Sequence, residues 1–387
     1  MSFLFSKRTS LADLGVPSRS MRRVGSVTVT NTSALTHSAV WAALRLRANL
    51  VSTMPVDEYQ RVGGVQQAIS PRSPFVESPG SLYLGGKKIT AGEWLYATQF
   101  DLDRGGNCFG FQDFDSRGAL ASVALTPLEA WSVNVRGGEV EYRFEGKKQD
   151  PREVWHERQY VVAGVPVGLS AVMVSSAAIG QYLSAQQFAL DWFSGGAVPT
   201  SSLKNTQKKI DPSEATTVKD RWMASVRAGE PVVLGADWEY SMISALANQS
   251  EFLATQKFSI ADVCRFFDIP GDMIDAESSS GSVTYANITQ RNLQLLVTAI
   301  GPAVKRREDA ITAALPRPRY VKLNTDAILR MDPKTRYEML AIGVTNRAVT
   351  PNEWRELDDR PPLTPDQEAE FARLFNPKTD APQKVSS

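Results

Sequence analysis

The chain has 387 residues, 42% of them hydrophobic, and its 43 Lys and Arg side chains nearly balance 42 Asp and Glu. This composition is typical of a folded globular protein and excludes a disordered chain, a collagen and a disulfide scaffold. A net charge of +1 lacks the clear basic excess that is usual for proteins that bind nucleic acid tightly, so any contact with DNA should be loose. Two cysteines and two histidines, Cys108, Cys264, His37 and His156, argue against a structural zinc site and for a reducing compartment.

The N-terminal residues are polar and basic, and they predict a mobile arm over 1–30. Only a short apolar triplet precedes Lys7, so we expect no secretory signal. Apolar residues then recur at helical spacing until Pro55, which predicts one amphipathic helix. These apolar positions are Val40, Leu44, Ala48 and Val51.

Residues 56–160 show β patterning, with short runs at 121–125 and 153–157 between glycines and charged turns. The clearest hairpin joins 131–135 to 139–144, because Gly137 and Gly138 supply the positive φ that its turn requires. We expect a meander of hairpins with one inserted helix near 91–101.

The second half begins with a predicted helix over 171–194. No charged residue occurs in 160–190, but glycines, glutamines and Pro166 lower the hydropathy, so we expect a buried helix rather than a membrane span. An extended piece at 198–203, a β pair around 231–243 and a helix over 249–267 follow. Three further helix starts combine an N-cap, a Pro and a Glu or Gln three residues after the cap, at 211–214, 350–353 and 364–367.

The longest predicted helix covers 285–315, and Gly301 and Pro302 should kink it. Its apolar side chains are expected on one face. They are Leu293, Leu296, Ile300, Val304 and Ile311. A strand over 320–324 and helices to about 374 complete the pattern.

Catalytic constellations are lacking in the sequence. Residues 80–88 resemble a phosphate-binding loop but have the wrong spacing. Residues 101–106 begin like a calcium loop, but Gln112 stands where the bidentate Glu is needed, so we expect a hairpin turn. His156 is expected to be a structural histidine, and both cysteines buried, unreactive thiols. We therefore predict a protein that is not an enzyme and holds no cofactor or metal.

The order of segments over 36–366 resembles the phage portal proteins of the HK97 type. The resemblance is carried by the strand around His156 and by Gly106-Asn107-Cys108-Phe109, Gly168-Leu169-Ser170 and the segments 40–55, 193–199, 257–270, 285–290 and 350–355. Departures are mild and comprise Asp268-Ile269 before Pro270 and the cysteine at 108.

The resemblance implies an α+β subunit with a β-rich wing, paired stem helices, an α/β clip, a long kinked helix and a helical crown, assembled as a ring. The parts would be a flexible arm (1–25), the wing (26–180 with a strand in 316–333), stem helices (181–194 and 248–270), the clip (195–247), a tunnel loop (271–284), the kinked helix (285–315), the crown (334–375) and a flexible tail (376–387).

The resemblance further implies that the DNA channel is lined in and beside the tunnel loop. The residues concerned are Asp272, Asp275, Glu277, Ser278, Ser279, Ser280, Ser282 and Tyr285. Residues 271–284 contain no Lys or Arg, and such a lining lets DNA slide, because every cation on a phosphate adds binding energy that must be undone. Gly301 and Pro302 would form a hinge. A plain surface loop remains the alternative for the Ser/Gly stretch.

The implied function is a non-enzymatic ring at one capsid vertex through which double-stranded DNA is packaged and ejected. The implied partners are further copies in a homododecamer, the major capsid protein, the terminase large subunit, the head-tail adaptor and non-specifically bound DNA, without a membrane. The protein would act in the virion after assembly in the host cytoplasm. Alternatives are another head structural or adaptor protein, or a DNA-acting hydrolase. Arg19, Arg22 and Arg23 leave open a solvated tail or contact with capsid or DNA.

Overall fold

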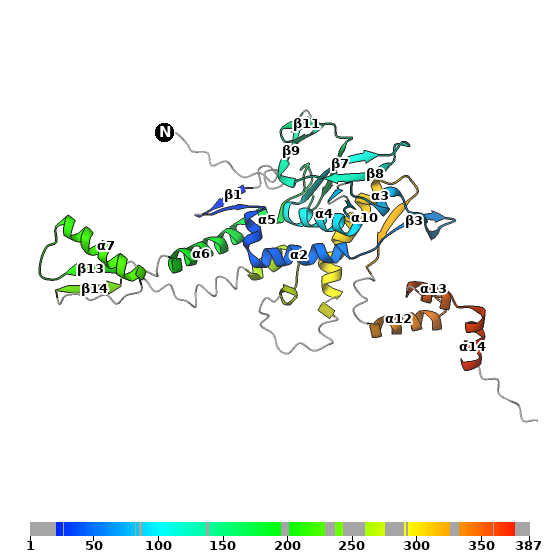
Figure 1. The fold of residues 1–387 in the computed structure, drawn as a ribbon. Coiled ribbons are helices and arrows are strands. Elements are labelled where there is room, and N and C mark those ends of the chain that lie inside the picture. The colour runs from blue at the N-terminus through cyan, green and yellow to red at the C-terminus, as the bar shows by residue number, and fades with distance from the viewer. Residues whose placement is uncertain are drawn as a thin grey trace, which may run out of the picture. The chain divides into compact units, whose positions relative to one another are not determined.

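The computed structural model describes residues 21–25, 27–81, 83–84, 87–136, 139–194, 201–228, 237–242, 260–274, 290–291, 293–325, 333–358 and 360–375. The chain divides into two compact units, Met1–Asn324 and Thr325–Ser387. Among the described residues, the first unit combines helices and antiparallel sheets, and the second consists of helices (Figure 1). The α+β class expected from the sequence is confirmed.

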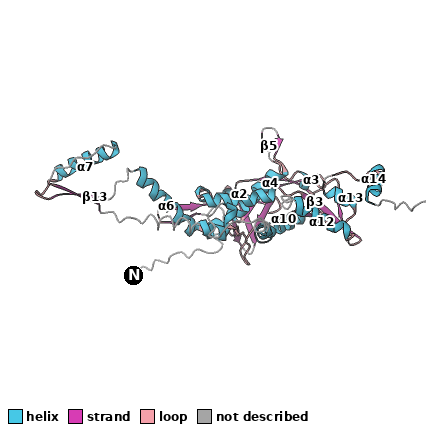
Figure 2. Cartoon of the chain, turned by 90° about the horizontal axis from the view of Figure 1, so that it is seen from below, coloured by secondary structure: helices cyan, strands magenta, loops and turns pink. Residues whose placement is uncertain are grey.

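Helix α2 (Ser38–Ser52) packs against helix α4 (Ala91–Gly105) at the centre of the first unit, as two views show (Figures 1 and 2). The predicted apolar face of α2 is confirmed, because all four of its expected positions are buried. A short η2 turn (Ser33–Thr36) leads into this helix. The side chain of His37 then caps it by accepting a hydrogen bond from the Ala39 amide.

Helix α4 begins with a capping box between Thr90 and Glu93 and ends at Gly106, which takes the left-handed conformation with φ 72°. The helix therefore continues four residues beyond the expected end at position 101. The expected hairpin turn over 101–106 was wrong. Leu102 and Asp103 extend the buried face of the helix by another turn, and Gly106 ends it.

Two antiparallel sheets form the middle of the first unit and are drawn as magenta arrows in Figure 2. The first has the order β15-β3-β4 and consists of β3 (Val56–Val62), β4 (Val65–Ala68) and β15 (Tyr320–Leu323). The second has the order β12-β7-β8 and consists of β7 (Asn107–Phe114), β8 (Leu120–Leu125) and β12 (Val154–Arg158). The predicted strand over 320–324 is thus confirmed, and it joins a sheet formed early in the chain.

A third sheet, of order β11-β10-β9, consists of β9 (Trp131–Arg136), β10 (Glu139–Phe144) and β11 (Lys147–Gln149). The predicted hairpin is confirmed by the pairing of Val140 with Val135, whereas its turn glycines lie outside the described residues. The remaining short elements here are α3 (Pro74–Glu77), β5 (Tyr83–Leu84), β6 (Lys87–Lys88) and η3 (Leu128–Ala130).

An aromatic cluster joins the first two sheets to α4 and to α10 (Gly301–Ala313). The rings of Phe75, Trp94 and Trp155 contact one another, with centroids 5.5 Å to 6.2 Å apart. Ile311 of α10 and Val321 of β15 belong to the same cluster. The late part of the chain therefore completes a core that the early part begins.

The mobile arm expected over 1–30 was wrong at its end, because β1 (Met21–Val24) and β2 (Val27–Thr30) pair as an antiparallel hairpin. This hairpin contacts helix α6 (Ser176–Ser194). A Cβ atom added to Gly180 would lie 2.4 Å from the Cβ of Val24, so the glycine permits a close approach. Polar composition alone could not predict this strand, because its support comes from a helix about 150 residues later.

The predicted helix over 171–194 is divided into α5 (Ala171–Val174) and α6. Ser170 caps α5 by accepting a hydrogen bond from the Met173 amide. The two helices meet at Ser175, whose hydroxyl donates to the Ala171 carbonyl at 2.7 Å. No helix in the described part of the chain is long and apolar enough to cross a bilayer.

Residues 201–242 contain β13 (Ser201–Asn205), α7 (Pro212–Ala228) and β14 (Trp238–Met242). Leu203 pairs with Tyr240, so the extended piece expected near 198–203 is the partner of β14. Residues 229–236, which would supply the first strand of the β pair expected around 231–243, lie outside the described residues. The pairing of β13 with β14 spans a helix and so leaves no local turn signal in the sequence. Helix α7 starts where its cap was predicted.

The second unit contains α12 (Pro333–Thr345), α13 (Pro351–Leu357) and α14 (Pro365–Phe375). The capping box of α13 is confirmed between Thr350 and Glu353. Thr364 and Gln367 exchange the corresponding two hydrogen bonds at 3.1 Å and 3.3 Å. The predicted frayed tail, 376–387, lies outside the described residues.

The ring of His37 connects the start of α2 to α6 by stacking on Tyr182, with centroids 3.7 Å apart. Burial lowers the pKa of His37 from 6.5 to about 4. The unfolded chain therefore takes up this proton first as the pH falls. We expect the contribution of His37 to the free energy of unfolding to be fully present above pH 6.5. Between pH 6.5 and 4, that contribution should fall by about 3 kcal/mol.

Denaturant titrations at several pH values test this expectation against the variant His37→Asn, which keeps a capping acceptor but does not titrate. The slope of unfolding free energy against pH should be smaller in the variant by up to about 1.4 kcal/mol per pH unit between pH 6.5 and 4. Equal slopes in the two proteins would contradict the assignment.

Candidate functional site

Most of the predicted channel residues lie outside the described part of the chain. These are Asp275, Glu277, Ser278, Ser279, Ser280, Ser282 and Tyr285. The structure describes the chain on both sides of them, as a helix over 260–266, the turn η4 (Gly271–Ile274), and residues from 290 onward. Of the helix expected over 249–267, the structure describes only the C-terminal part, 260–266.

Asp272 is the one predicted channel residue whose contacts are described. Its Oδ2 lies 2.5 Å from Nη1 of Arg291, and both side chains are about one quarter exposed. The ion pair therefore joins the chain before 275–289 to the chain after it. Asp272 is also not a free anion, although no cation occurs within 271–284. Its partner, Arg291, lies seven residues beyond 271–284 and could not be inferred from the composition of that stretch.

Helix α2 supports the chain on both sides of 275–289. It contacts η4 on one side and η5 (Leu295–Ile300) on the other. Arg47, at the buried face of α2, donates from Nη1 to the carbonyl of Phe267 at 3.0 Å. The helix over 260–266 is thereby fixed at its C-terminal end, where free carbonyls need donors. The sequence contained a sign of this buried arginine, because Arg47 lies on the same helix face as the apolar Leu44 and Val51.

The predicted kink at Gly301 and Pro302 takes the form of a π-helical turn, η5, directly before α10. The Gly301 amide donates to the carbonyl of Leu296, five residues earlier. Proline lacks the amide hydrogen and its ring crowds the carbonyl four residues back, so a widened turn at this point accommodates Pro302. Whether the two residues act as a hinge stays a prediction.

The π turn also changes which side chains face inward. Ile300, Val304 and Ile311 are buried as predicted, but Leu293 is 53% exposed, as is Val297 beside it at 63%. The expectation of one continuous apolar face was therefore wrong at Leu293. An extra residue in the turn rotates the preceding helix by about 100°, which moves its apolar side chains out of register with α10.

Two buried ion pairs hold α2 and α10 in place, the first to helix α4 and the second to strand β12. Nε of Arg47 lies 3.1 Å from Asp103, and the amide of Gln159 also donates to this carboxylate at 2.7 Å. Burial opposes the charge of Arg47, but Asp103 beside it keeps the pKa of the guanidinium above its ordinary value.

Arg307 of α10 makes the second pair. Its guanidinium donates to Glu157 at 2.6 Å and to the Thr98 hydroxyl of α4 at 2.7 Å, and it lies over the Trp94 ring. Burial raises the pKa of Glu157, and Arg307 opposes that effect. Strand β12, α4 and α10 therefore share one buried charge cluster.

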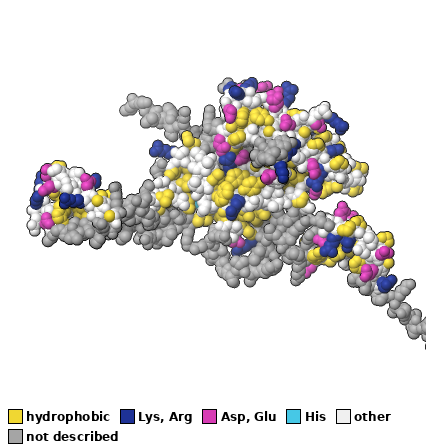
Figure 3. Space-filling model, viewed as in Figure 1, with side chains coloured by type: hydrophobic (Ala, Val, Ile, Leu, Met, Phe, Trp, Pro, Cys, Tyr) yellow, Lys and Arg dark blue, Asp and Glu magenta, His cyan; other side chains and the backbone are white. Residues whose placement is uncertain are grey.

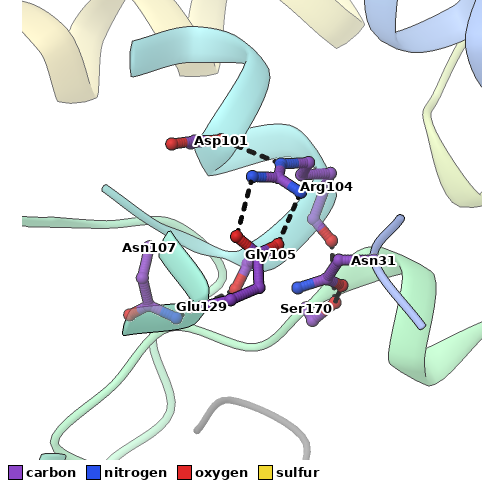
Figure 4. A network of polar contacts seen from close by, with 7 residues as sticks. All are labelled: Asn31, Asp101, Arg104, Gly105, Asn107, Glu129 and Ser170. Atoms are coloured by element: carbon purple, nitrogen blue, oxygen red, sulfur yellow. Dashed lines mark hydrogen bonds and ion pairs between the residues drawn. The ribbon is translucent and has the colours of Figure 1, made fainter. Parts of the chain in front are cut away.

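A polar network closes the junction between α4, β2 and α5 (Figure 4). Arg104 lies between Asp101, at 2.8 Å, and Glu129, at 2.7 Å, while its own carbonyl accepts from the Ser170 hydroxyl. Ser170 also donates to the Asn31 side chain at 3.2 Å. Burial raises the pKa of Asp101, and Arg104 opposes this. The junction fixes the start of α5, and hence of α6, to the sheets.

Two motifs that carry the family resemblance, 106–109 and 168–170, meet at this junction. The Asn107 side chain donates to the Gly168 carbonyl and accepts from the Gly168 amide, at 2.9 Å and 2.7 Å. A Cβ atom on Gly106 would lie 2.2 Å from the Leu169 carbonyl oxygen, and one on Gly168 would lie 2.0 Å from the Gly106 oxygen. Only glycine fits at either position without displacing the facing backbone.

The histidine and the cysteines that were considered for catalysis are buried among core side chains. His156 contacts Tyr142 at 3.1 Å and Asn107 at 3.0 Å, stacks on Phe109, and has its pKa lowered by burial to about 3. Cys108 and Cys264 are buried free thiols, and burial raises the pKa of each. In the described ranges, no group of three or more His, Cys, Asp and Glu side chains could hold a metal ion.

The surface in Figure 3 intersperses Lys and Arg with Asp and Glu side chains, without a broad field of one sign among the coloured residues. Apolar side chains lie between them over the first unit. On this face, the mixture of signs agrees with the net charge of +1.

Comparison with known proteins gives a consistent result. A family model described as phage portal protein matches residues 38–359. The portal protein of Enterobacteria phage HK97 is 24% identical over 377 residues, which cover 92% of this chain and 86% of that protein. Among solved structures, an HK97 family phage portal protein from Corynebacterium diphtheriae matches with a TM-score of 0.61 and 18% identity, over 79% of this chain and 98% of that one. A chain in the neck of a native gene transfer agent particle, computed with C12 symmetry, matches with a TM-score of 0.56 and 16% identity, over 86% of this chain and 94% of that one.

The junction glycines provide a stability test with a matched control. Gly106 and Gly118 both have positive φ, 72° and 76°, but nothing lies within 4 Å of a Cβ atom on Gly118. Gly118→Ala should cost about 1 kcal/mol of unfolding free energy from the backbone alone. Gly106→Ala should cost at least about 2 kcal/mol more, because the Leu169 carbonyl must move. Equal costs in chemical denaturation would show that the close approach is not needed.

Proposed function

Because the chain belongs to the phage portal protein family, we propose that it is the subunit of a ring at one capsid vertex through which double-stranded DNA enters and leaves the head. The observation that carries this proposal is the family match over residues 38–359. The fold supports it, since the shared architecture spans 98% of the Corynebacterium portal chain. A closed ring of copies is supported by the twelvefold symmetry applied to the related neck structure.

We assign the parts of the subunit from the described elements. The wing, 26–180 with β15, comprises the three sheets with α2 and α4, and α10 belongs to the long kinked helix, 285–315. One stem helix, 181–194, lies within α6, and the other, 248–270, includes the helix over 260–266. The clip comprises β13, α7 and β14, and the crown comprises α12, α13 and α14. The tunnel loop at 271–284 faces the bore.

The proposed work is geometric and non-enzymatic. A bore that conducts DNA must hold phosphates weakly, because each cation in contact adds binding energy at every step of translocation. Asp275 and Glu277 are anions in a stretch without Lys or Arg, and Arg291 close by is already paired with Asp272. This composition supports a lining with little affinity for the polyanion.

The proposed partners follow from position in the head. Further copies would form a homododecamer, the major capsid protein would surround the wing, and the clip would dock the terminase large subunit and then the head-tail adaptor. The subunit would assemble in the host cytoplasm and remain in the virion. Nuclease and ATPase assays on the isolated chain would distinguish a hydrolase from this structural role.

Negative-stain electron microscopy of the purified protein tests the ring. We expect annular particles with a central hole and rotational symmetry. Monodisperse monomers at every salt and protein concentration would contradict the proposal. A ring located elsewhere in the virion than at a capsid vertex would instead favour another head structural protein.

Deletion of residues 278–282 tests the part played by the tunnel loop. We expect rings of normal size whose particles package or retain less DNA, because the lining of the bore has changed. Deletion of the five C-terminal residues, 383–387, is a control of equal length. DNA protected from nuclease in each particle is the measurement, and wild-type protection after the first deletion would remove the loop from the mechanism.

A further inference from the structure

Building on the proposed function, we infer that Asp272 and Arg291 are positioning residues for residues 275–289, which contain most of the proposed tunnel loop and are called the DNA-facing segment below. Their ion pair joins the chain at the two ends of this segment and neutralises Arg291 next to the proposed DNA path. The two side chains are 19 positions apart in the sequence and meet at 2.5 Å. They are the last described charged residue before 275–289 and the first after it. The pair is therefore the described contact nearest to both ends of that segment.

The rest of the base is built from contacts that do not involve this pair. Helix α2 contacts both η4 and η5, and Arg47 of α2 binds the Phe267 carbonyl. Further along the chain, Arg307 holds α10 to α4 and β12. Both flanks thus rest on one rigid support without the help of Asp272 or Arg291. Removing the pair should free the ends of the segment and leave the fold of the support intact.

The charge of the pair matters as well as its geometry. An unpaired Arg beside moving DNA would bind phosphates, and such binding weakens steeply with added salt. Asp272 occupies the guanidinium of Arg291 through a charge-assisted hydrogen bond. The two single variants should therefore differ. Asp272→Asn exposes a cation, whereas Arg291→Gln removes it.

Hydrogen exchange on assembled full-length rings tests the tie. In Asp272→Asn and in Arg291→Gln, we expect the amides of 275–289 to exchange roughly fivefold faster than in wild type, with ring dimensions unchanged. The double variant Asp272→Arg with Arg291→Asp restores an ion pair, and its exchange should return to within about twofold of wild type. Wild-type exchange in both single variants, or failure of the double variant to restore it, would overturn the inference.

Release of a short double-stranded DNA from the rings tests the neutralisation. At low salt, Asp272→Asn should release DNA roughly threefold more slowly than wild type, and the difference should vanish at high salt. Arg291→Gln should not slow release. Equal release by the two single variants at low salt would contradict the charge argument.

A matched control lies on α10, where Lys305 and Asp309 form an exposed ion pair four residues apart. The variant Lys305→Gln with Asp309→Asn removes an ion pair from α10 without touching Asp272 or Arg291. Its exchange and DNA release should equal those of wild type. If wild-type rings fail to form or to pass DNA, the proposed function fails. If they succeed and the single variants behave like wild type, only this inference fails.

Discussion

The first unit depends on two guanidinium groups that are almost completely removed from water. Arg47 and Arg307 are each 1% exposed. A buried charge left without its partner costs about 3–5 kcal/mol, so each arginine requires its carboxylate in place. Asp103 and Glu157 come from α4 and β12, and this requirement fixes α2 and α10 against the same helix and sheet. An alternative arrangement of these elements would leave at least one charge buried and unpaired.

This constraint supports the chain on both sides of 275–289, the segment that we propose faces DNA. The chain that enters the segment is bound to α2 through Phe267, and the chain that leaves it continues through a π turn into α10. Both ends therefore rest on elements that the buried arginines hold in place.

Features that depend on local chemistry could be predicted from the sequence. The capping boxes at Thr90 and Thr350 and the β9–β10 hairpin follow from neighbours a few residues apart. The capping box at Thr90 was nevertheless missed, because the helix near 91–101 was predicted without a defined first residue. Features that depend on distant residues escaped prediction. The strand at 21–24 needs α6, and β13 finds its partner beyond α7.

The site was predictable only in part for the same reason. Acidic and hydroxyl residues mark the stretch after position 271, but neither the pairing of Asp272 with Arg291 nor the outward position of Leu293 can be derived from periodicity. A cryo-electron microscopy reconstruction of the assembled protein tests the central claim most directly. The account predicts that Asp272 and Arg291, in contact, lie next to the symmetry axis in every subunit. A reconstruction with this pair on the outer perimeter of the ring would contradict it.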